Sequence, residues 1–117
     1  MGFLEQHATL PTYNGPVDQE GRPHGVGRTV EVDYKSYEGD FVHGKRHGHG
    51  EVLYANGHRF VGAFEDDARC GLGREWWPNG QLKHEGAYLR SQRHGPGKMY
   101  SAEGALVFDR EFAHGRP

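Results

Sequence analysis

Histidine is the residue type in this chain that most suggests chemistry, because nine of the 117 residues are histidines. His24, His47 and His94 occupy the same place in three similar segments, and His43, His47 and His49 lie close together in the sequence. Histidine clusters can hold zinc, whose ligands stand about 2 Å from the metal. If the similar segments stack as strands, however, equivalent side chains lie about 10 Å apart. We therefore expect the histidines to hydrogen-bond within turns, and we expect no metal site and no cofactor.

One segment has the spacing of a phosphate-binding loop. Gly39–Lys45 follows the pattern G-x-x-x-x-G-K, but Arg46 stands where a Ser or Thr would hold magnesium, and no helix begins there. Four G-x-G pairs, which begin at Gly25, Gly48, Gly71 and Gly95, all lack the third glycine of a dinucleotide-binding loop. The sequence therefore predicts no nucleotide site and no small-molecule substrate.

Nucleophiles are equally sparse. The serines at 36, 91 and 101 lie outside any G-x-S-x-G elbow. Cys70 is the single cysteine, so an intramolecular disulfide is excluded and a reducing compartment is favoured. We expect a non-catalytic protein of the cytoplasm, with association to the cytoskeleton or to a membrane as a further expectation.

The one charge pattern that recurs in register is basic. Arg46, Arg69 and Arg93 fall at the same place in successive segments, and stacking would line them along one sheet edge. Such an edge would bind an anionic partner, either an acidic protein segment or lipid head groups. Alternatively, the charges would only keep the edge soluble. Both interpretations stay open. The net charge of −2 provides no strong field for nucleic acid, so we expect no nucleic-acid partner.

All these side chains belong to a sequence repeat of 23 or 24 residues. Its copies begin near residues 13, 37, 60, 84 and 108, with the last copy truncated and residues 1–12 forming an N-terminal extension. A fixed period of this length is typical of repeat architectures, in which each unit buries its face by stacking on its neighbours. The sequence therefore predicts one repeat array over residues 13–117.

Within a repeat, the alternation of Tyr37, Gly39 and Phe41 with polar residues is typical of a strand. Asn56-Gly57 and Asn79-Gly80 predict hairpin connections. Two strands per repeat give an all-β fold, a single-layer antiparallel meander of stacked hairpins with about nine strands. The glycines leave room for aromatic rings to lie on the backbone, and a single layer fits the low hydrophobic content of 34%.

The motif Y-x-G-x-F-x-x-G-x-x-H-G-x-G, best seen in Tyr37–Gly50, resembles the MORN (membrane occupation and recognition nexus) repeat. Departures from the pattern are Asp67 and Ser91 for a mid-repeat glycine, Cys70 for the histidine, His84 for the leading aromatic residue and Arg110 for a strand glycine. The resemblance implies protein binding and scaffolding, often in cytoskeletal or membrane-adjacent assemblies. The resemblance also implies two alternatives: phospholipid binding, or a role as the accessory domain of a larger enzyme.

We expect the leading aromatic residues to line a curved groove that water can reach and that binds a helical or extended segment of another protein, or of a second copy. The predicted groove residues are Tyr37, Phe41, Tyr54, Phe60, Phe64, Trp77, Tyr88 and Phe108, with Phe112 on the same face. The predicted edge for an anionic partner consists of the three arginines of the basic row. Peripheral binding of anionic phospholipid is the alternative function.

Overall fold

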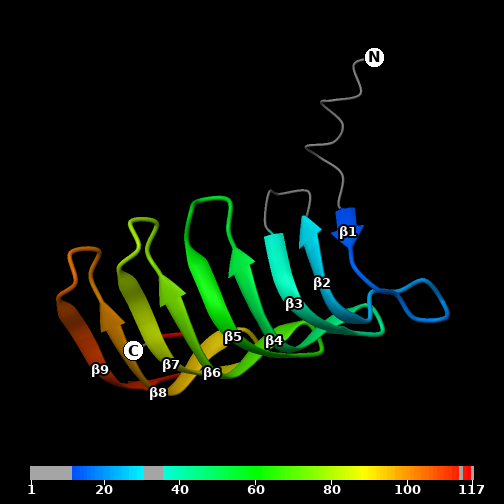
Figure 1. Cartoon of the computed structure of the whole chain (residues 1–117). Coiled ribbons are helices and arrows are strands. Elements are labelled where there is room, and N and C mark those ends of the chain that lie inside the picture. Colours follow the sequence, from blue (N-terminus) through cyan, green and yellow to red (C-terminus); the bar gives the residue numbers. More distant parts are fainter. Residues whose placement is uncertain (1–11, 31–35, 114, 117) are drawn as a thin grey trace.

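Strands and turns alternate along the chain as the repeat predicts. The computed structural model describes residues 12–30, 36–113 and 115–116, and these form one antiparallel sheet in which each strand pairs with its neighbours in sequence (Figure 1). The strands are β1 (Thr12–Asn14), β2 (Gly25–Val30), β3 (Ser36–Val42), β4 (Lys45–Leu53), β5 (Arg59–Glu65), β6 (Ala68–Trp76), β7 (Leu82–Leu89), β8 (Gln92–Tyr100) and β9 (Leu106–Phe112). The predicted all-β meander is confirmed. The proposed N-terminal extension lies outside the described residues, except for Thr12.

Two kinds of turn connect the strands. Tight two-residue turns join β3 to β4, β5 to β6 and β7 to β8, and both residues of each turn have positive φ: His43-Gly44 (46° and 87°), Asp66-Asp67 (49° and 71°) and Arg90-Ser91 (49° and 67°). This is the type I′ geometry that matches the twist of a hairpin. The predicted Asn-Gly pairs lie instead within longer loops, 54–58 and 77–81, at the opposite end of the strands.

The strands bend sharply toward one face. The ring centroids of Tyr37 and Phe41 are 5.1 Å apart, although four residues of a straight strand span about 13 Å. The partner strand permits this bend through a bulge, because Gly39 pairs with Gly50 while Phe41 pairs with Arg46, so that three residues of β4 oppose a single residue of β3. The same irregularity recurs between β5 and β6 and between β7 and β8. The ring-bearing side is therefore concave.

Aromatic rings fill the concave face as a continuous ladder. Among the described residues, each ring packs edge-to-face against the next at centroid separations of 4.7 to 5.6 Å. In contact order this ring ladder consists of Tyr13, Phe41, Tyr37, Phe64, Phe60, Tyr88, His84, Phe112 and Phe108. Edge-to-face pairs add about 0.5–1.5 kcal/mol each beyond area burial. The ladder is thus the core of a sheet that has no second layer.

Glycines make room for these rings, as the sequence predicts. A Cβ built on Gly62 would lie 2.7 Å from Cζ of Phe60 and 2.8 Å from the backbone of Gly73. On the neighbouring strand, a Cβ on Gly50 would lie 2.3 Å from the ring of Tyr37. These separations are shorter than any ordinary carbon contact, so only glycine fits beneath these two rings.

Candidate interaction surface

The predicted groove residues come together, but most of them are not open to water. Tyr37, Phe41, Phe60, Phe64 and Tyr88 are only 0 to 5% exposed. The expectation of an aromatic face in contact with water is wrong for these five rings, because the bend closes each strand over its own rings and every ring packs against two others. Tyr54, Trp77 and Phe108 are half-buried and form the accessible part of the predicted set. Phe112 is buried.

The arginines of the basic row lie in register and contact the ring ladder. The guanidinium of Arg46 stands 5.7 Å from the ring centroid of Tyr37 and 5.3 Å from that of Phe64. Arg69 stands 5.1 and 4.9 Å from two rings of the ladder, and Arg93 stands 5.9 Å from one. The three arginines are the second residues of β4, β6 and β8, next to the tight turns, and their guanidinium groups cover the ring ladder as cation–π partners instead of standing free.

Each of these arginines is also held by a polar partner. Arg46 bonds Asp67 through its Nε at 3.2 Å and through its Nη2 to the backbone oxygen at 2.9 Å. Arg69 donates from Nη2 to the backbone oxygen of Ser91. Arg93 binds Glu75 with two bonds of 2.9 and 3.1 Å. An anionic ligand would have to compete with these partners, which lowers the attraction of the basic row for lipid head groups.

A polar chain is built into the ladder around Glu75. The Tyr88 hydroxyl donates to the Glu75 carboxylate, and Nδ1 of His84 lies 2.8 Å from that hydroxyl. Burial pushes the pKa of Glu75 up, but hydrogen bonds from Arg93 and Tyr88 and the nearby positive charges hold it below its ordinary value. Burial, and then the charge of Glu75, raise the pKa of Tyr88 far above its ordinary value. Both groups therefore keep one protonation state at neutral pH.

Half-exposed aromatic residues mark one border of the concave face. Tyr54, Trp77 and Tyr100 occupy equivalent places just after or at the end of β4, β6 and β8, and we call them the aromatic rim. Nε1 of Trp77 donates to the backbone oxygen of Tyr100 at 3.0 Å, and the Lys83 ammonium stands 4.6 Å from the Trp77 ring centroid. Tyr54 packs against the core, and burial raises the pKa of its hydroxyl. The aromatic rim is therefore a rigid surface.

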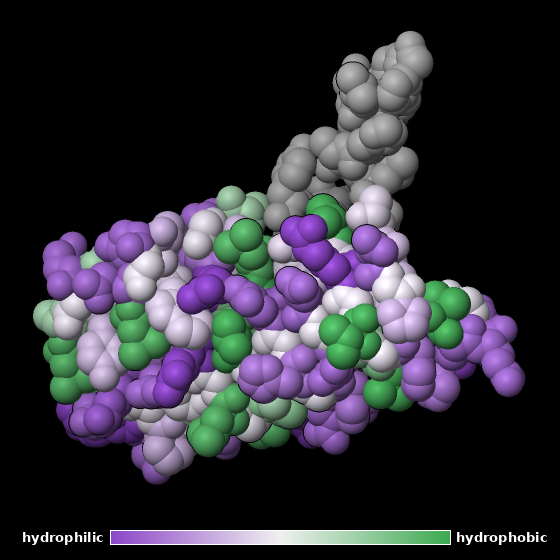
Figure 2. Space-filling model, in the orientation of Figure 1, coloured by the Kyte–Doolittle hydropathy of each residue, from purple (hydrophilic) through white to green (hydrophobic). Residues whose placement is uncertain are grey.

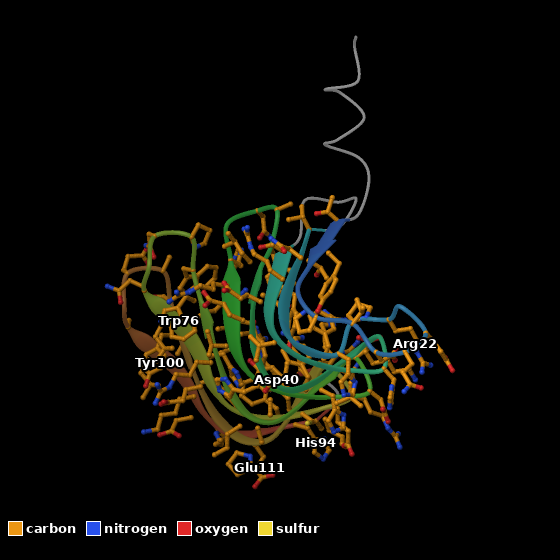
Figure 3. All side chains as sticks on the ribbon, turned by 45° about the vertical axis from the view of Figure 1, so that its right-hand side comes forward. Arg22, Asp40, Trp76, His94, Tyr100 and Glu111 are labelled. Carbon is orange, nitrogen blue, oxygen red and sulfur yellow. The ribbon has the colours of Figure 1, made fainter. Side chains whose placement is uncertain are left out.

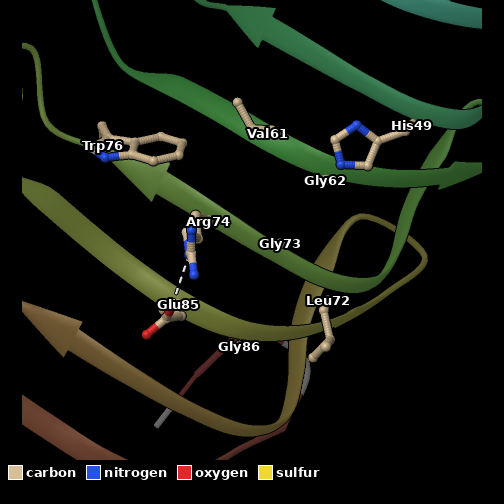
Figure 4. Close-up of a pocket in the computed structure, with 9 residues that line it drawn as sticks. All are labelled: His49, Val61, Gly62, Leu72, Gly73, Arg74, Trp76, Glu85 and Gly86. Carbon is tan, nitrogen blue, oxygen red and sulfur yellow. Dashed lines mark hydrogen bonds and ion pairs between the residues drawn. The ribbon is translucent and has the colours of Figure 1, made fainter.

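The outer face has a shallow hollow of about 390 Å³ (Figure 4). Val61, Leu72 and Trp76 stand around a floor of glycine backbone, and the Arg74–Glu85 ion pair of 2.7 Å crosses it. Leu72 is 78% exposed. The view in Figure 2 shows apolar side chains in separate groups among hydrophilic ones rather than as one continuous apolar band.

A second polar cluster was missed by sequence reasoning. Asp18, His24 and His43 approach one another at the N-terminal end of the sheet, with their potential ligand atoms all within 4.8 Å. His24 and His43 occupy different places of the repeat and are 19 residues apart, so neither repeat register nor nearness in sequence pairs them. Contact between the β1–β2 connection and the β3–β4 turn, which spacing alone does not reveal, brings them together.

The contacts of Cys70 and Ser91, two candidate nucleophiles, are those of residues with a structural role. Burial raises the pKa of the Cys70 thiol, which keeps it in the less reactive protonated form. The Ser91 hydroxyl accepts a hydrogen bond from the Arg69 amide at 3.0 Å. These contacts give no support to nucleophilic catalysis at either residue. Separately, the described part of the chain contains no helix with the length and apolar character needed to cross a membrane.

Known proteins share both the repeat and its register. The MORN repeat profile matches residues 37–59, 60–82 and 84–105, which are three of the predicted copies. The chain is 32% identical over 88 residues to alsin from Homo sapiens and from Mus musculus, and equally so to alsin from Rattus norvegicus. Each alignment covers 71% of this chain but only 5% of alsin, so the chain spans a small part of the length of these relatives. With three matched copies and nine strands in the expected order, this chain belongs to the MORN repeat family.

Proposed function

We propose that this chain is a non-catalytic interaction module whose concave face binds a helical segment of another protein. MORN repeats in general bind proteins or membranes. The observation that carries the proposal is the aromatic rim, whose half-exposed rings repeat in register beside a row of arginines. Trp77 is held by a hydrogen bond and Tyr54 by packing on the core. Half-buried aromatic and arginine side chains are the residue types that most often anchor protein interfaces.

The spacing of the rim favours a helix. Successive repeats are two strands apart, about 10 Å. Residues i and i+7 of an α-helix are also separated by about 10 Å along its axis. A helix that lies along the stacking direction can therefore place one apolar side chain against each of Tyr54, Trp77 and Tyr100. An acidic side chain on its flank would face Arg69, which is half-buried and is bonded to a backbone oxygen rather than to an acid.

The alternatives are less well supported. Anionic phospholipid would need the basic row, but Arg46 and Arg93 are only 19% and 18% exposed in their side chains and are paired with acids. The 5% coverage of alsin supports the idea that an array of this kind can be one part of a longer protein. Self-association through the outer edges of β1 and β9, which pair with no further strand among the described residues, is a further form of protein binding. We propose a cytoplasmic setting, with attachment to the cytoskeleton or a membrane through the partner.

Two adjacent tryptophans allow a matched test. Trp76 lies on the outer face, with its ring 4.4 Å from the Arg59 guanidinium, whereas Trp77 belongs to the aromatic rim. Affinity capture from the native source should recover the same partner with wild type and Trp76→Ala, and lose it with Trp77→Ala. Melting temperatures of all three proteins check that the fold is kept. Loss with Trp76→Ala alone would place the partner on the outer face and contradict the proposal.

A further inference from the structure

The N-terminal end of the array contains a compact set of metal-binding groups that the proposed function does not use. Asp18 comes from the β1–β2 connection, His24 from the residue before β2, and His43 from the first place of the β3–β4 turn. Their potential ligand atoms lie within 4.8 Å of one another. Nδ1 of His43 is 2.9 Å from Oδ2 of Asp18, and the two imidazole centroids are 4.7 Å apart. Figure 3 shows Arg22 of the same connection far from Trp76 and Tyr100.

Backbone contacts hold these groups in place without a ligand. The Gly44 amide donates to the Pro23 oxygen at 2.7 Å, which ties the turn to the connection. The other carboxylate oxygen of Asp18 accepts the amides of Glu20 and Arg22 at 2.8 and 3.0 Å. The Asp18 side chain is only 9% exposed. Its Oδ2 therefore has a fixed direction, toward His43.

We propose that Asp18, His24 and His43 bind a zinc ion. Two imidazole nitrogens and one carboxylate oxygen are a ligand set that zinc takes, with a fourth position left for water. Tetrahedral ligands about 2 Å from the metal are roughly 3.3 Å from one another, and the Asp18–His43 separation already has this scale. Zinc would take the place of the hydrogen between Nδ1 of His43 and Oδ2 of Asp18, and the neutral imidazole would then carry its hydrogen on Nε2.

Arg22 is the group that opposes the ion. Its Nε bonds Oδ2 of Asp18 at 2.9 Å, and its Nη2 lies 3.4 Å from Nδ1 of His43. The side chain is 45% exposed and also pairs with Glu20 at 2.9 Å, so it can turn outward and keep a partner. Arg22 and zinc therefore compete for the same carboxylate. This competition distinguishes a metal site from a turn held only by hydrogen bonds.

Zinc would stabilise the part of the array that has the least pairing. β1 is three residues long and pairs only with β2. An ion that joins the β1–β2 connection to the first type I′ turn would fasten this end of the sheet to the first complete repeat. Binding should therefore be visible as thermal stabilisation as well as in a direct titration.

The experiment is calorimetric titration of the full chain, first treated with chelator, with Zn²⁺ alone. One equivalent should bind to wild type, and His43→Ala and His24→Ala should each weaken binding at least tenfold. His49→Ala, which removes an exposed histidine elsewhere, should bind as wild type does. Arg22→Ala should bind more tightly. Zn²⁺ should raise the melting temperature of wild type and of His49→Ala but not of His43→Ala.

Asp18→Asn keeps an oxygen for the two amides and replaces the ligand oxygen Oδ2 with an NH2 group, so it tests the site if a histidine variant fails to fold. It should also weaken binding at least tenfold. Equal affinity in wild type, His43→Ala and Asp18→Asn would overturn the proposal, because scattered surface histidines would then account for the binding. Unchanged or weaker binding by Arg22→Ala would overturn it as well.

Discussion

The buried imidazole of His84 donates a hydrogen bond from Nδ1 to the hydroxyl of Tyr88, 2.8 Å away. The direction follows because that hydroxyl gives its own hydrogen to Glu75. His84 is 0% exposed, and its Nε2 has no partner among the described residues. A histidine thus takes the place that Tyr37 and Phe60 take in other repeats, and it works there as a neutral ring.

This relationship predicts a loss of stability in mild acid. Burial, opposed in part by Glu75, lowers the pKa of His84 from 6.5 to about 4. Between these values the unfolded chain binds one more proton than the folded chain, so the free energy of unfolding falls as the pH falls. Across the whole window the loss amounts to roughly 3 kcal/mol. Urea unfolding at pH 7 and at pH 4.5 measures it.

His84→Phe is the matched control for the acid effect. Phenylalanine restores a ring of the type found at Phe60, and Tyr88 can still donate to Glu75. Between pH 4 and 6.5, the free energy of unfolding of the variant should lack the part of the pH dependence that comes from one proton. The part that comes from the carboxylates should stay the same. An identical pH dependence in wild type and variant would show that His84 is not the titrating group.

The glycines beneath the ladder should not tolerate a side chain. Gly62→Val would place atoms within 3 Å of the Phe60 ring and of the Gly73 backbone, and only the ring can move. Overpacking of this kind costs about 1–3 kcal/mol or more. Ala63→Val, one residue along on the outer face, should change the free energy of unfolding by less than about 0.5 kcal/mol. Equal melting temperatures for the two variants would contradict this account of the glycines.

The turn residues that replace glycine, Asp67 and Ser91, accept hydrogen bonds from backbone amides of the neighbouring repeat. Oδ1 of Asp67 accepts the amide of Arg46 at 2.8 Å, and Asp67 itself has a φ of 71°. Asp67→Ala loses the bond and strains the turn, so we expect a cost of about 1–2 kcal/mol. Asp67→Asn keeps an acceptor and suits positive φ, and should stay within about 0.5 kcal/mol of wild type. Chemical denaturation of both variants measures these changes. An equal loss of stability in Asp67→Ala and Asp67→Asn would show that the hydrogen bond from the Arg46 amide does not stabilise the turn.

Spacing along the chain predicts strand order and the face on which a residue lies, but not the curvature of the sheet. The alternation of Tyr37, Gly39 and Phe41 correctly indicates a strand with its rings on one side. The bulge opposite Asp40 bends that strand, and the bend hides the rings and carries Arg46 over them. The meeting of His24 with His43 likewise depends on how a turn contacts a loop. These relations arise from three-dimensional packing, which a repeat period does not encode.

The buried ladder makes Phe64 a residue of the core rather than an anchor for a partner. Its side chain is 3% exposed and packs edge-to-face on Tyr37 and Phe60. Removing a buried aromatic ring costs about 3–5 kcal/mol, a large share of the roughly 5–15 kcal/mol that holds a typical domain together. Phe64→Ala should therefore lower the melting temperature strongly in the absence of any partner.

Leu72→Ala provides the contrast, because Leu72 is an exposed residue of the outer face and its truncation should cost less than about 0.5 kcal/mol. If the concave face were open to water, Phe64→Ala would also be mild, since an exposed ring adds little to stability. Comparable melting temperatures for the two variants would thus contradict the buried ladder. A steep loss confined to Phe64→Ala would leave the aromatic rim, and not the ladder, as the surface that a partner can reach.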